Sequence, residues 1–190
     1  MEEGGAVRIL HLAMTLVLII SVISAVACDG NDASTLPSRS GYKIFSKYGL
    51  SFEFPDDCTI SEHGVMENQA NDTDGVVLAS SDKMAINVYW TASVQDLFKG
   101  DPHYLNNFYF NMEQQSGITD IEREEWEETV KLGHQVIYER FSFQGERKLF
   151  GIYGVWYCSN SQRMFDFVAV HDWARMLPLC KGVLESVHCH

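Results

Sequence analysis

The sequence has little positive charge. Its 190 residues include 14 Lys and Arg against 26 Asp and Glu, which gives a formal net charge of −12 at pH 7. At most two basic residues stand next to each other. Binding to phosphate backbones or to anionic headgroups depends on clustered basic residues. We therefore expect no nucleic-acid partner and no purely electrostatic docking on a membrane.

The sequence also lacks the short motifs of common catalytic sites. It contains no Gly-x-Ser-x-Gly elbow, Walker loop, His-Glu-x-x-His helix or Gly-x-Gly-x-x-Gly turn. His171 and Asp172 could supply half of a Ser-His-Asp triad, but adjacent residues rarely make the triad contact, so they are predicted to form a loop. The histidines His63, His103 and His134 are interpreted as isolated surface or strand residues. We expect no enzymatic activity and no cofactor.

Residues 71–75, Asn-Asp-Thr-Asp-Gly, are similar to part of a calcium-binding loop. In that register Ala70 and Ser81 stand where an EF-hand needs carboxylates. The segment therefore predicts a polar turn and no metal site.

Cys28 follows the predominantly apolar residues 9–27, and Ala25 and Ala27 lie directly before it. This pattern is similar to a bacterial or archaeal lipoprotein signal, cut before Cys28 and lipidated on its thiol. The stretch is also long enough to remain as an uncleaved anchor, and plain secretion is a third alternative. All three place the rest of the chain outside the cytoplasm, unless the segment inserts in the opposite orientation.

Four widely spaced cysteines remain: Cys58, Cys158, Cys180 and Cys189. None forms Cys-x-x-Cys, which disfavours a thioredoxin-like redox site or a zinc knuckle. In an oxidising compartment such a set predicts structural disulfides. Three pairings are possible, and we favour Cys158–Cys189 with Cys58–Cys180, because Cys158 ends a predicted strand and Cys189 ends the chain.

A metal site is the alternative use of the last of these cysteines. Cys189 stands between His188 and His190, and both residue types bind transition metals. An exposed terminal segment lacks a rigid scaffold for tetrahedral coordination, so this alternative is disfavoured.

The composition divides the chain into three parts. Residues 1–27 are the predicted signal peptide or membrane anchor, and residues 28–41 are small and polar, as is typical of a flexible tether. Residues 42–190 have the length of one domain.

Hydrophobic patterning predicts an α+β domain built on a central antiparallel sheet. One helix is expected from Asp101 to Gly117 and another over 177–187, while residues 61–75 are expected to be a loop. The strand over 147–158 is apolar on both faces, which predicts helices covering the sheet. Strands are expected at 42–45, 50–54, 76–80, 84–90, 134–143, 147–158 and 163–170.

Residues 118–131 contain six acidic side chains. The segment is interpreted as a sheet edge whose charges prevent unwanted strand addition. The alternative is a site for a cation or a basic partner.

Several features in order carry a resemblance: the Tyr-Gly-Leu-Ser-Phe-Glu-Phe-Pro segment at 48–55, the predicted helix, the long hairpin, and the closing Glu-Ser-Val at 185–187. Over residues 42–188 the chain resembles the PsbP-like family, which includes the extrinsic subunit of photosystem II and small lipoproteins. The resemblance implies an α/β/α sandwich that binds proteins as an accessory subunit and has no shared catalytic residues. Cys58 replaces the aromatic residue usual after the first Pro, which implies different packing there.

The sequence therefore predicts a membrane-tethered, non-enzymatic accessory protein with a protein partner. The alternative is a carrier of a small ligand or metal, with a pocket between sheet and helix. Its lining would be Trp90, Phe108, Trp126, Tyr153 and Trp156.

Overall fold

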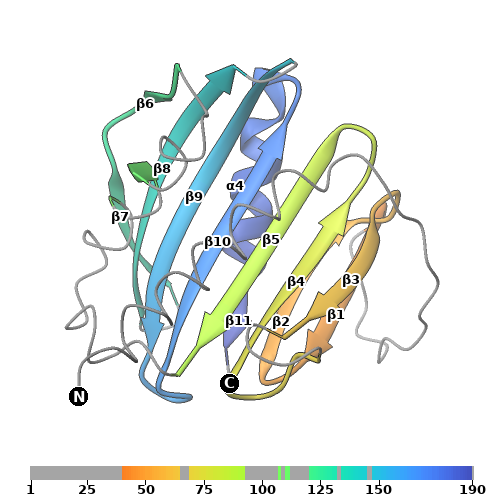
Figure 1. Cartoon of the computed structure of the whole chain (residues 1–190), viewed down its shortest axis with the longest axis vertical. Coiled ribbons are helices and arrows are strands. Elements are labelled where there is room, and N and C mark those ends of the chain that lie inside the picture. The colour runs from red at the N-terminus through yellow and green to blue at the C-terminus, as the bar shows by residue number, and fades with distance from the viewer. Residues whose placement is uncertain are drawn as a thin grey trace, which may run out of the picture.

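The computed structural model describes residues 40–64, 69–92, 107, 110–111, 120–131, 134–144 and 147–189. These residues form two antiparallel sheets and one α-helix (Figure 1). The strands are β1 (Tyr42–Lys47), β2 (Leu50–Pro55), β3 (Thr59–His63), β4 (Asp74–Ser80), β5 (Met84–Thr91), β6 (Glu122–Arg123), β7 (Glu127–Lys131), β8 (His134–Gln144), β9 (Lys148–Cys158), β10 (Arg163–His171) and β11 (His188–Cys189). The helices are the short 3₁₀ segment η2 (Ala174–Met176) and α4 (Leu177–Ser186).

The larger sheet has the strand order β3-β4-β5-β10-β9-β8-β6, with β7 also paired to β8. Its centre is the β8–β9–β10 meander, whose strands are buried along nearly their whole length. The smaller sheet has the order β1-β2-β11. The predicted strands are all present, most of them one or two residues longer than expected.

The helix α4 and the smaller sheet pack on the same face of the larger sheet. Their apolar side chains join those of β4, β5, β9 and β10 in one core, in which Trp156 stacks on Phe165 with ring centroids 5.2 Å apart. Gly154 lies under α4, where an added Cβ would come within 3.0 Å of Leu184. The absence of a side chain at this position lets the helix approach the sheet closely.

The opposite face of the larger sheet carries a second apolar cluster. Phe110 packs there against Phe141 and Tyr153, with centroid distances of 5.3 and 5.8 Å. Most of the helix predicted over 101–117 lies outside the described residues, but Asn107, Phe110 and Asn111 are helical.

The predicted α/β/α sandwich is correct in its antiparallel sheet and too rich in helix. Apart from the helical residues Asn107, Phe110 and Asn111, the described residues contain one α-helix, α4, and a second small sheet shares its layer. The first hairpin pairs with β11 and therefore forms a separate sheet that covers the core.

The loop predicted over 61–75 is also wrong in part, because Thr59–His63 pairs with β4 as an edge strand. Four of its five residues are polar, so apolar patterning did not reveal it.

A two-residue turn connects β1 to β2 and has positive φ at both positions, 55° at Tyr48 and 61° at Gly49. This is the backbone of a type I′ hairpin turn. The buried Arg163 guanidinium donates to the carbonyl oxygens of Tyr48 and Asp72, at 2.6 and 2.9 Å. Arg163 thus fastens this turn to the loop before β4.

Candidate functional site

The edge of the larger sheet formed by residues 122–131 is the most unusual surface of the described chain. We call these residues, which comprise β6, β7 and the link between them, the acidic edge. Residues 122–130 are all exposed, including the large apolar side chains of Trp126 (48%) and Val130 (76%). These side chains offer apolar area, rimmed by charges, that a protein partner could cover.

Part of the charge on the acidic edge is neutralised by neighbouring strands. Arg140 on β8 pairs with Glu124 and Glu127, each at 3.4 Å, and Lys148 on β9 pairs with Glu122 at 2.9 Å. Lys148 and the Ser142 hydroxyl lower the pKa of Glu122. Glu125 is exposed and has no such partner among the described residues.

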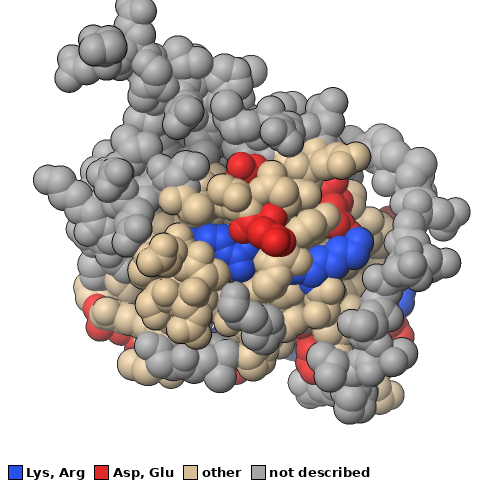
Figure 2. Space-filling model, turned by 90° about the horizontal axis from the view of Figure 1, so that it is seen from below, with Lys and Arg blue, Asp and Glu red and all other residues tan. Residues whose placement is uncertain are grey.

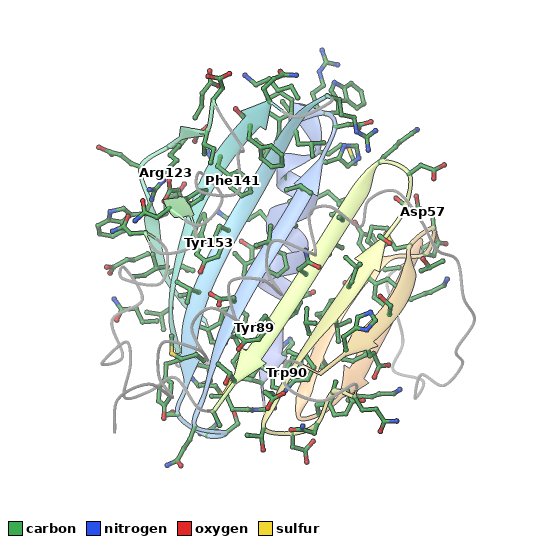
Figure 3. The ribbon with its side chains drawn as sticks, viewed as in Figure 1. Asp57, Tyr89, Trp90, Arg123, Phe141 and Tyr153 are labelled. Atoms are coloured by element: carbon green, nitrogen blue, oxygen red, sulfur yellow. A yellow bond between two sulfur atoms is a disulfide. The ribbon has the colours of Figure 1, made fainter. Side chains whose placement is uncertain are left out.

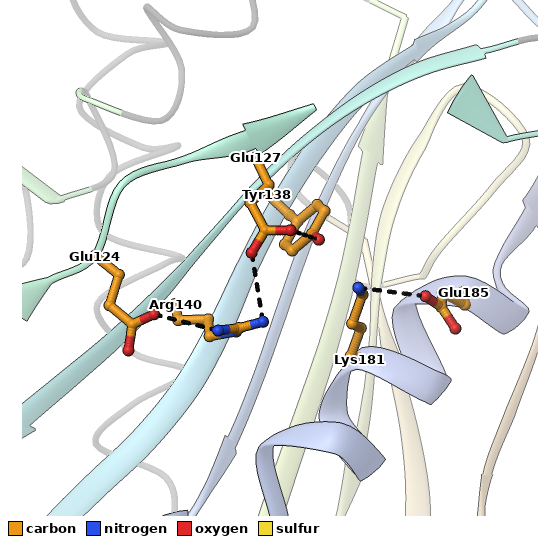
Figure 4. A network of polar contacts seen from close by, with 6 residues as sticks. All are labelled: Glu124, Glu127, Tyr138, Arg140, Lys181 and Glu185. Carbon is orange, nitrogen blue, oxygen red and sulfur yellow. Dashed lines mark hydrogen bonds and ion pairs between the residues drawn. The ribbon is translucent and has the colours of Figure 1, made fainter. Parts of the chain in front are cut away.

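A polar network connects the acidic edge to α4 (Figure 4). The Tyr138 hydroxyl donates to Glu127, and the Lys181 ammonium lies 5.1 Å from the centre of the Tyr138 ring. Burial and the bond to Glu127 raise the pKa of Tyr138. Lys181 also lies 3.8 Å from Glu185 on the next turn of α4. The network fixes one side of β7 relative to the core.

Arg123 fixes the other end of the acidic edge. Its Nε and Nη2 donate to the two carboxylate oxygens of Glu139, at 2.5 and 2.8 Å, and its guanidinium carbon lies 4.1 Å from the centre of the Phe110 ring. Figure 3 shows Arg123 at the sheet edge, beside Phe141. The acidic edge is therefore bonded to β8 at both ends, although its outer side chains are exposed.

A buried cluster of His134, Cys158 and Cys189 lies where β8 begins and β9 ends. Cys158 and Cys189 form the predicted disulfide, with their Cα atoms 6.5 Å apart. The Nε2 atom of His134 lies 3.8 Å from the sulfur of Cys158 and 3.5 Å from that of Cys189. The disulfide covalently joins the two sheets, since Cys189 belongs to β11 and Cys158 to β9.

His134 was not predicted to belong to a site. It is a strand residue, as expected, but it is buried and lies against the disulfide. The observed register, in which Val136 pairs with Trp156, places His134 opposite Cys158 when it is continued by two residues. The hairpin expected from the sequence turns at 144–146 and would place His134 opposite Trp156, so the sequence did not reveal this contact.

The second predicted disulfide is not formed: Cys58 and Cys180 are both buried free thiols. Cys58 lies in the turn after β2, and Cys180 lies on the inner face of α4. Burial raises the pKa of Cys58 to about 11 and that of Cys180 to about 12. Both residues serve as small core side chains.

The possible metal ligands that the described residues gather around Cys189 differ from those considered from the sequence. Cys189 is bonded to Cys158 and lies beside His134. His190 lies outside the described residues.

The four described aromatic residues of the carrier hypothesis do not line one pocket. Trp90 and Trp156 belong to the core beneath α4, Tyr153 belongs to the cluster on the opposite face, and Trp126 is exposed. Trp90 and Tyr153 lie well apart on the sheet (Figure 3). Phe108 lies outside the described residues. The carrier hypothesis in this form is wrong.

A buried polar pair lies on the face of the larger sheet opposite α4, next to the apolar cluster around Phe110. The Tyr153 hydroxyl donates to Asp166 at 2.5 Å, and Tyr89 is the register partner of Asp166. Burial raises the pKa of Asp166 to about 6. The carboxyl group of Asp166 therefore changes its protonation state within the pH range in which protein stability is usually measured.

Two other predicted positions form local structure. Asn71 accepts from the backbone N–H groups of Thr73 and Asp74, at 2.7 and 3.0 Å, which forms the expected polar turn. His171 ends β10, and its Nδ1 accepts from the Trp173 N–H at 3.0 Å. Burial lowers the pKa of His171, and the neighbouring Asp172 pairs with Arg147.

Charges of both signs lie close together on the face seen in Figure 2, and the visible described surface there has no broad basic patch. No helix among the described residues is long and apolar enough to cross a membrane. Cys28, the predicted signal segment and nearly all of the predicted tether lie outside the described residues.

The described structure is an antiparallel-sheet domain of the PsbP-like fold. It is similar to the solution structure of cyanobacterial PsbP from Synechocystis sp. PCC 6803, with a TM-score of 0.56 and 14% identity, over 84% of this chain and 98% of that chain. A protein of unknown function from Pseudomonas aeruginosa matches with a TM-score of 0.43 and 14% identity, over 77% of this chain and 96% of that chain. No family model and no curated protein sequence matches the chain. The similarity defines the fold, and the fold alone does not define the activity.

Proposed function

We propose that the chain is an extracytoplasmic, non-enzymatic accessory protein that is tethered to the membrane through a lipidated Cys28 and binds a protein partner at the acidic edge. The observation that carries the proposal is the exposure of Trp126, in the link between β6 and β7, and of Val130 on the edge strand β7. The PsbP-like fold is compatible with an accessory role.

The structure of the acidic edge indicates the kind of partner. Among the described residues β7 pairs with β8 alone, so its outer side can accept a further strand. The carboxylates oppose strand addition by neutral or acidic chains, whereas Lys or Arg on the incoming segment would offset their charge. The partner is therefore an extended, basic protein segment with an apolar residue to cover Val130.

The disulfide supports the proposed location. Cys158–Cys189 is closed in the structure, and such bonds persist mainly in oxidising compartments. The tether would raise the effective concentration of the domain near partners in the same membrane.

Quantitative affinity capture of the full chain from native membranes tests the binding surface. Changing Glu125→Lys together with Trp126→Ala should reduce the recovery of a specific partner by at least about tenfold, since buried aromatic residues dominate interface energies. Trp173→Ala is the matched control, because Trp173 is equally exposed (54%) but lies before η2. Equal losses for both variants, or no loss for the double variant, would contradict the proposal.

Fractionation of the Cys28→Ser variant tests the tether. Lipidation predicts that the variant leaves the membrane fraction and is released with the domain intact. Unchanged retention in the membrane would favour an uncleaved anchor instead.

A further inference from the structure

The described residues contain one group of three metal-ligating side chains that converge on a common point. The Nε2 of His134 and the sulfurs of Cys158 and Cys189 all lie within 4.8 Å of one another, and all three residues are buried. In the oxidised chain the two sulfurs are bonded to each other. The cluster then has no ligand function, and its chemistry depends on that bond.

The spacing of these atoms is close to that of a zinc site. Bonds of about 2.3 Å to sulfur and 2.0–2.1 Å to nitrogen, at tetrahedral angles, place neighbouring donor atoms roughly 3.5 to 3.8 Å apart. His134 Nε2 already lies 3.8 and 3.5 Å from the two sulfurs. Only the sulfur–sulfur separation would have to increase, and it does so when the disulfide opens.

The imidazole of His134 has no other polar contact among the described residues. Its side chain is buried, with 8% of the residue exposed, and the two sulfurs are its only polar neighbours there. Burying an imidazole beside a disulfide gives it no strong hydrogen bond, since sulfur is a weak acceptor. If the two sulfurs become metal ligands, the His134 imidazole is placed to bind the same ion.

All three residues of the cluster lie in hydrogen-bonded strands. His134 begins β8, Cys158 ends the neighbouring β9, and Cys189 is held in β11 by pairing with Leu50 on β2. These three donors come from three different strands, unlike the terminal His-Cys-His arrangement considered from sequence. One tetrahedral position is left for water or another exogenous ligand.

We propose that the chain has a redox-gated metal site, in which reduction of Cys158–Cys189 creates a Cys₂His site for Zn²⁺. A dithiol reductant transfers two electrons and two protons to the pair, which breaks the sulfur–sulfur bond and leaves two thiols, while the reductant becomes a disulfide. Zinc binding then displaces the two thiol protons, and His134 binds as neutral imidazole. The ion would keep β11 linked to β9 after the covalent bond is lost.

Zinc binding by the full chain in its two redox states tests this proposal. The protein is reduced anaerobically with a phosphine, equilibrated with Zn²⁺ and a competing chelator, desalted, and analysed for metal. We expect one zinc per reduced chain and none in the oxidised chain. Absence of stoichiometric zinc in the reduced chain, or equal binding in both states, would overturn the proposal.

Variants separate this site from the other thiols. Cys58→Ala with Cys180→Ala, and separately Cys28→Ser, should retain the zinc, whereas Cys189→Ser should lose it. His134→Gln keeps both sulfurs and the disulfide, and should weaken zinc binding by at least about tenfold. Unchanged affinity in His134→Gln, or loss of zinc in the Cys58/Cys180 variant, would contradict the assignment.

Cobalt provides a second readout that does not depend on the fold of the cysteine variants. The reduced wild-type chain with Co²⁺ should show sulfur-to-cobalt charge-transfer absorption and the visible bands of a tetrahedral ion. Oxidation should abolish both. A spectrum without charge-transfer absorption would exclude thiolate coordination.

Discussion

Arg123 on the exposed β6 is bonded through two nitrogens to Glu139, a β8 carboxylate that is only 1% exposed. The pair connects the most charged surface of the domain to the apolar cluster around Phe110 and Phe141. Because one partner is buried, the loss of the other leaves a charge in a poorly solvated place.

Arg123→Met should therefore lower the free energy of unfolding by about 3 kcal/mol. Glu124→Gln is the control, because its ion pair with Arg140 is exposed and should contribute less than about 1 kcal/mol. Urea denaturation of both variants measures the difference. Equal effects would show that the Arg123–Glu139 pair is no more important than a surface ion pair.

The disulfide should stabilise the domain by restricting the unfolded chain. Its two cysteines are 31 residues apart, and the chain-entropy relation gives about 3 to 4 kcal/mol for a loop of that size. Cys158→Ala with Cys189→Ala should lose about this amount, measured by denaturation with a metal chelator present. A variant as stable as the wild type would contradict a structural role for the bond.

Cys58 and Cys180 should be unreactive in the folded protein. Burial raises their pKa values to about 11 and 12, so almost no thiolate exists at pH 8. Peptide mapping should show alkylation of both residues only after denaturation without reductant, with Cys158 and Cys189 recovered as a cross-linked pair. Recovery of a Cys58–Cys180 cross-link would contradict the free thiols and support the pairing predicted from the sequence.

Asp166 should make the domain less stable as the pH rises. Its folded pKa of about 6 lies above the value for an unfolded Asp, so the native state binds more protons between about pH 4 and pH 6, and stability falls across that window. The penalty at pH 7.5 is roughly 2 to 3 kcal/mol at about 1.4 kcal/mol per pKa unit.

Asp166→Asn should remove this loss, so that it is more stable than wild type at pH 7.5 and similar to it at pH 4. Tyr153→Phe removes the hydrogen bond that lowers the pKa of Asp166 and should enlarge the loss. The exposed Asp82→Asn serves as the control. Urea denaturation at pH 4 and pH 7.5 measures the free energy of unfolding of each variant. If Asp166→Asn shows the same pH dependence as the wild type, the raised pKa of Asp166 is contradicted.

The long strands β8, β9 and β10 were predictable because their apolar residues favour strands locally and because neighbours in the sequence pair with each other. Hydrophobic patterning predicted β8, β9 and β10, including the strand β9 that is apolar on both faces, but it did not give the register that places His134 opposite Cys158. The edge strand β3 and the two-residue β11 were not predictable, because each is defined by a distant partner and not by its own sequence.

The site was less predictable than the fold. The acidic composition of 118–131 indicated a sheet edge, and β6 and β7 confirm an edge there, in two short strands. The exposure of Trp126 and Val130 depends on the position of β7 relative to the core. No local sequence pattern specifies that position. The burial of Glu139 beneath Arg123 likewise arises from tertiary packing.

Site-specific photo-crosslinking tests the central claim, that the acidic edge binds a protein partner, most directly. A photoreactive amino acid replaces Val130 in the full chain in native membranes, and Lys43 on the edge strand β1 is the matched control position. We expect a discrete protein adduct from position 130 that disappears with Glu125→Lys and Trp126→Ala. No adduct from position 130, or the same adduct from position 43, would contradict it.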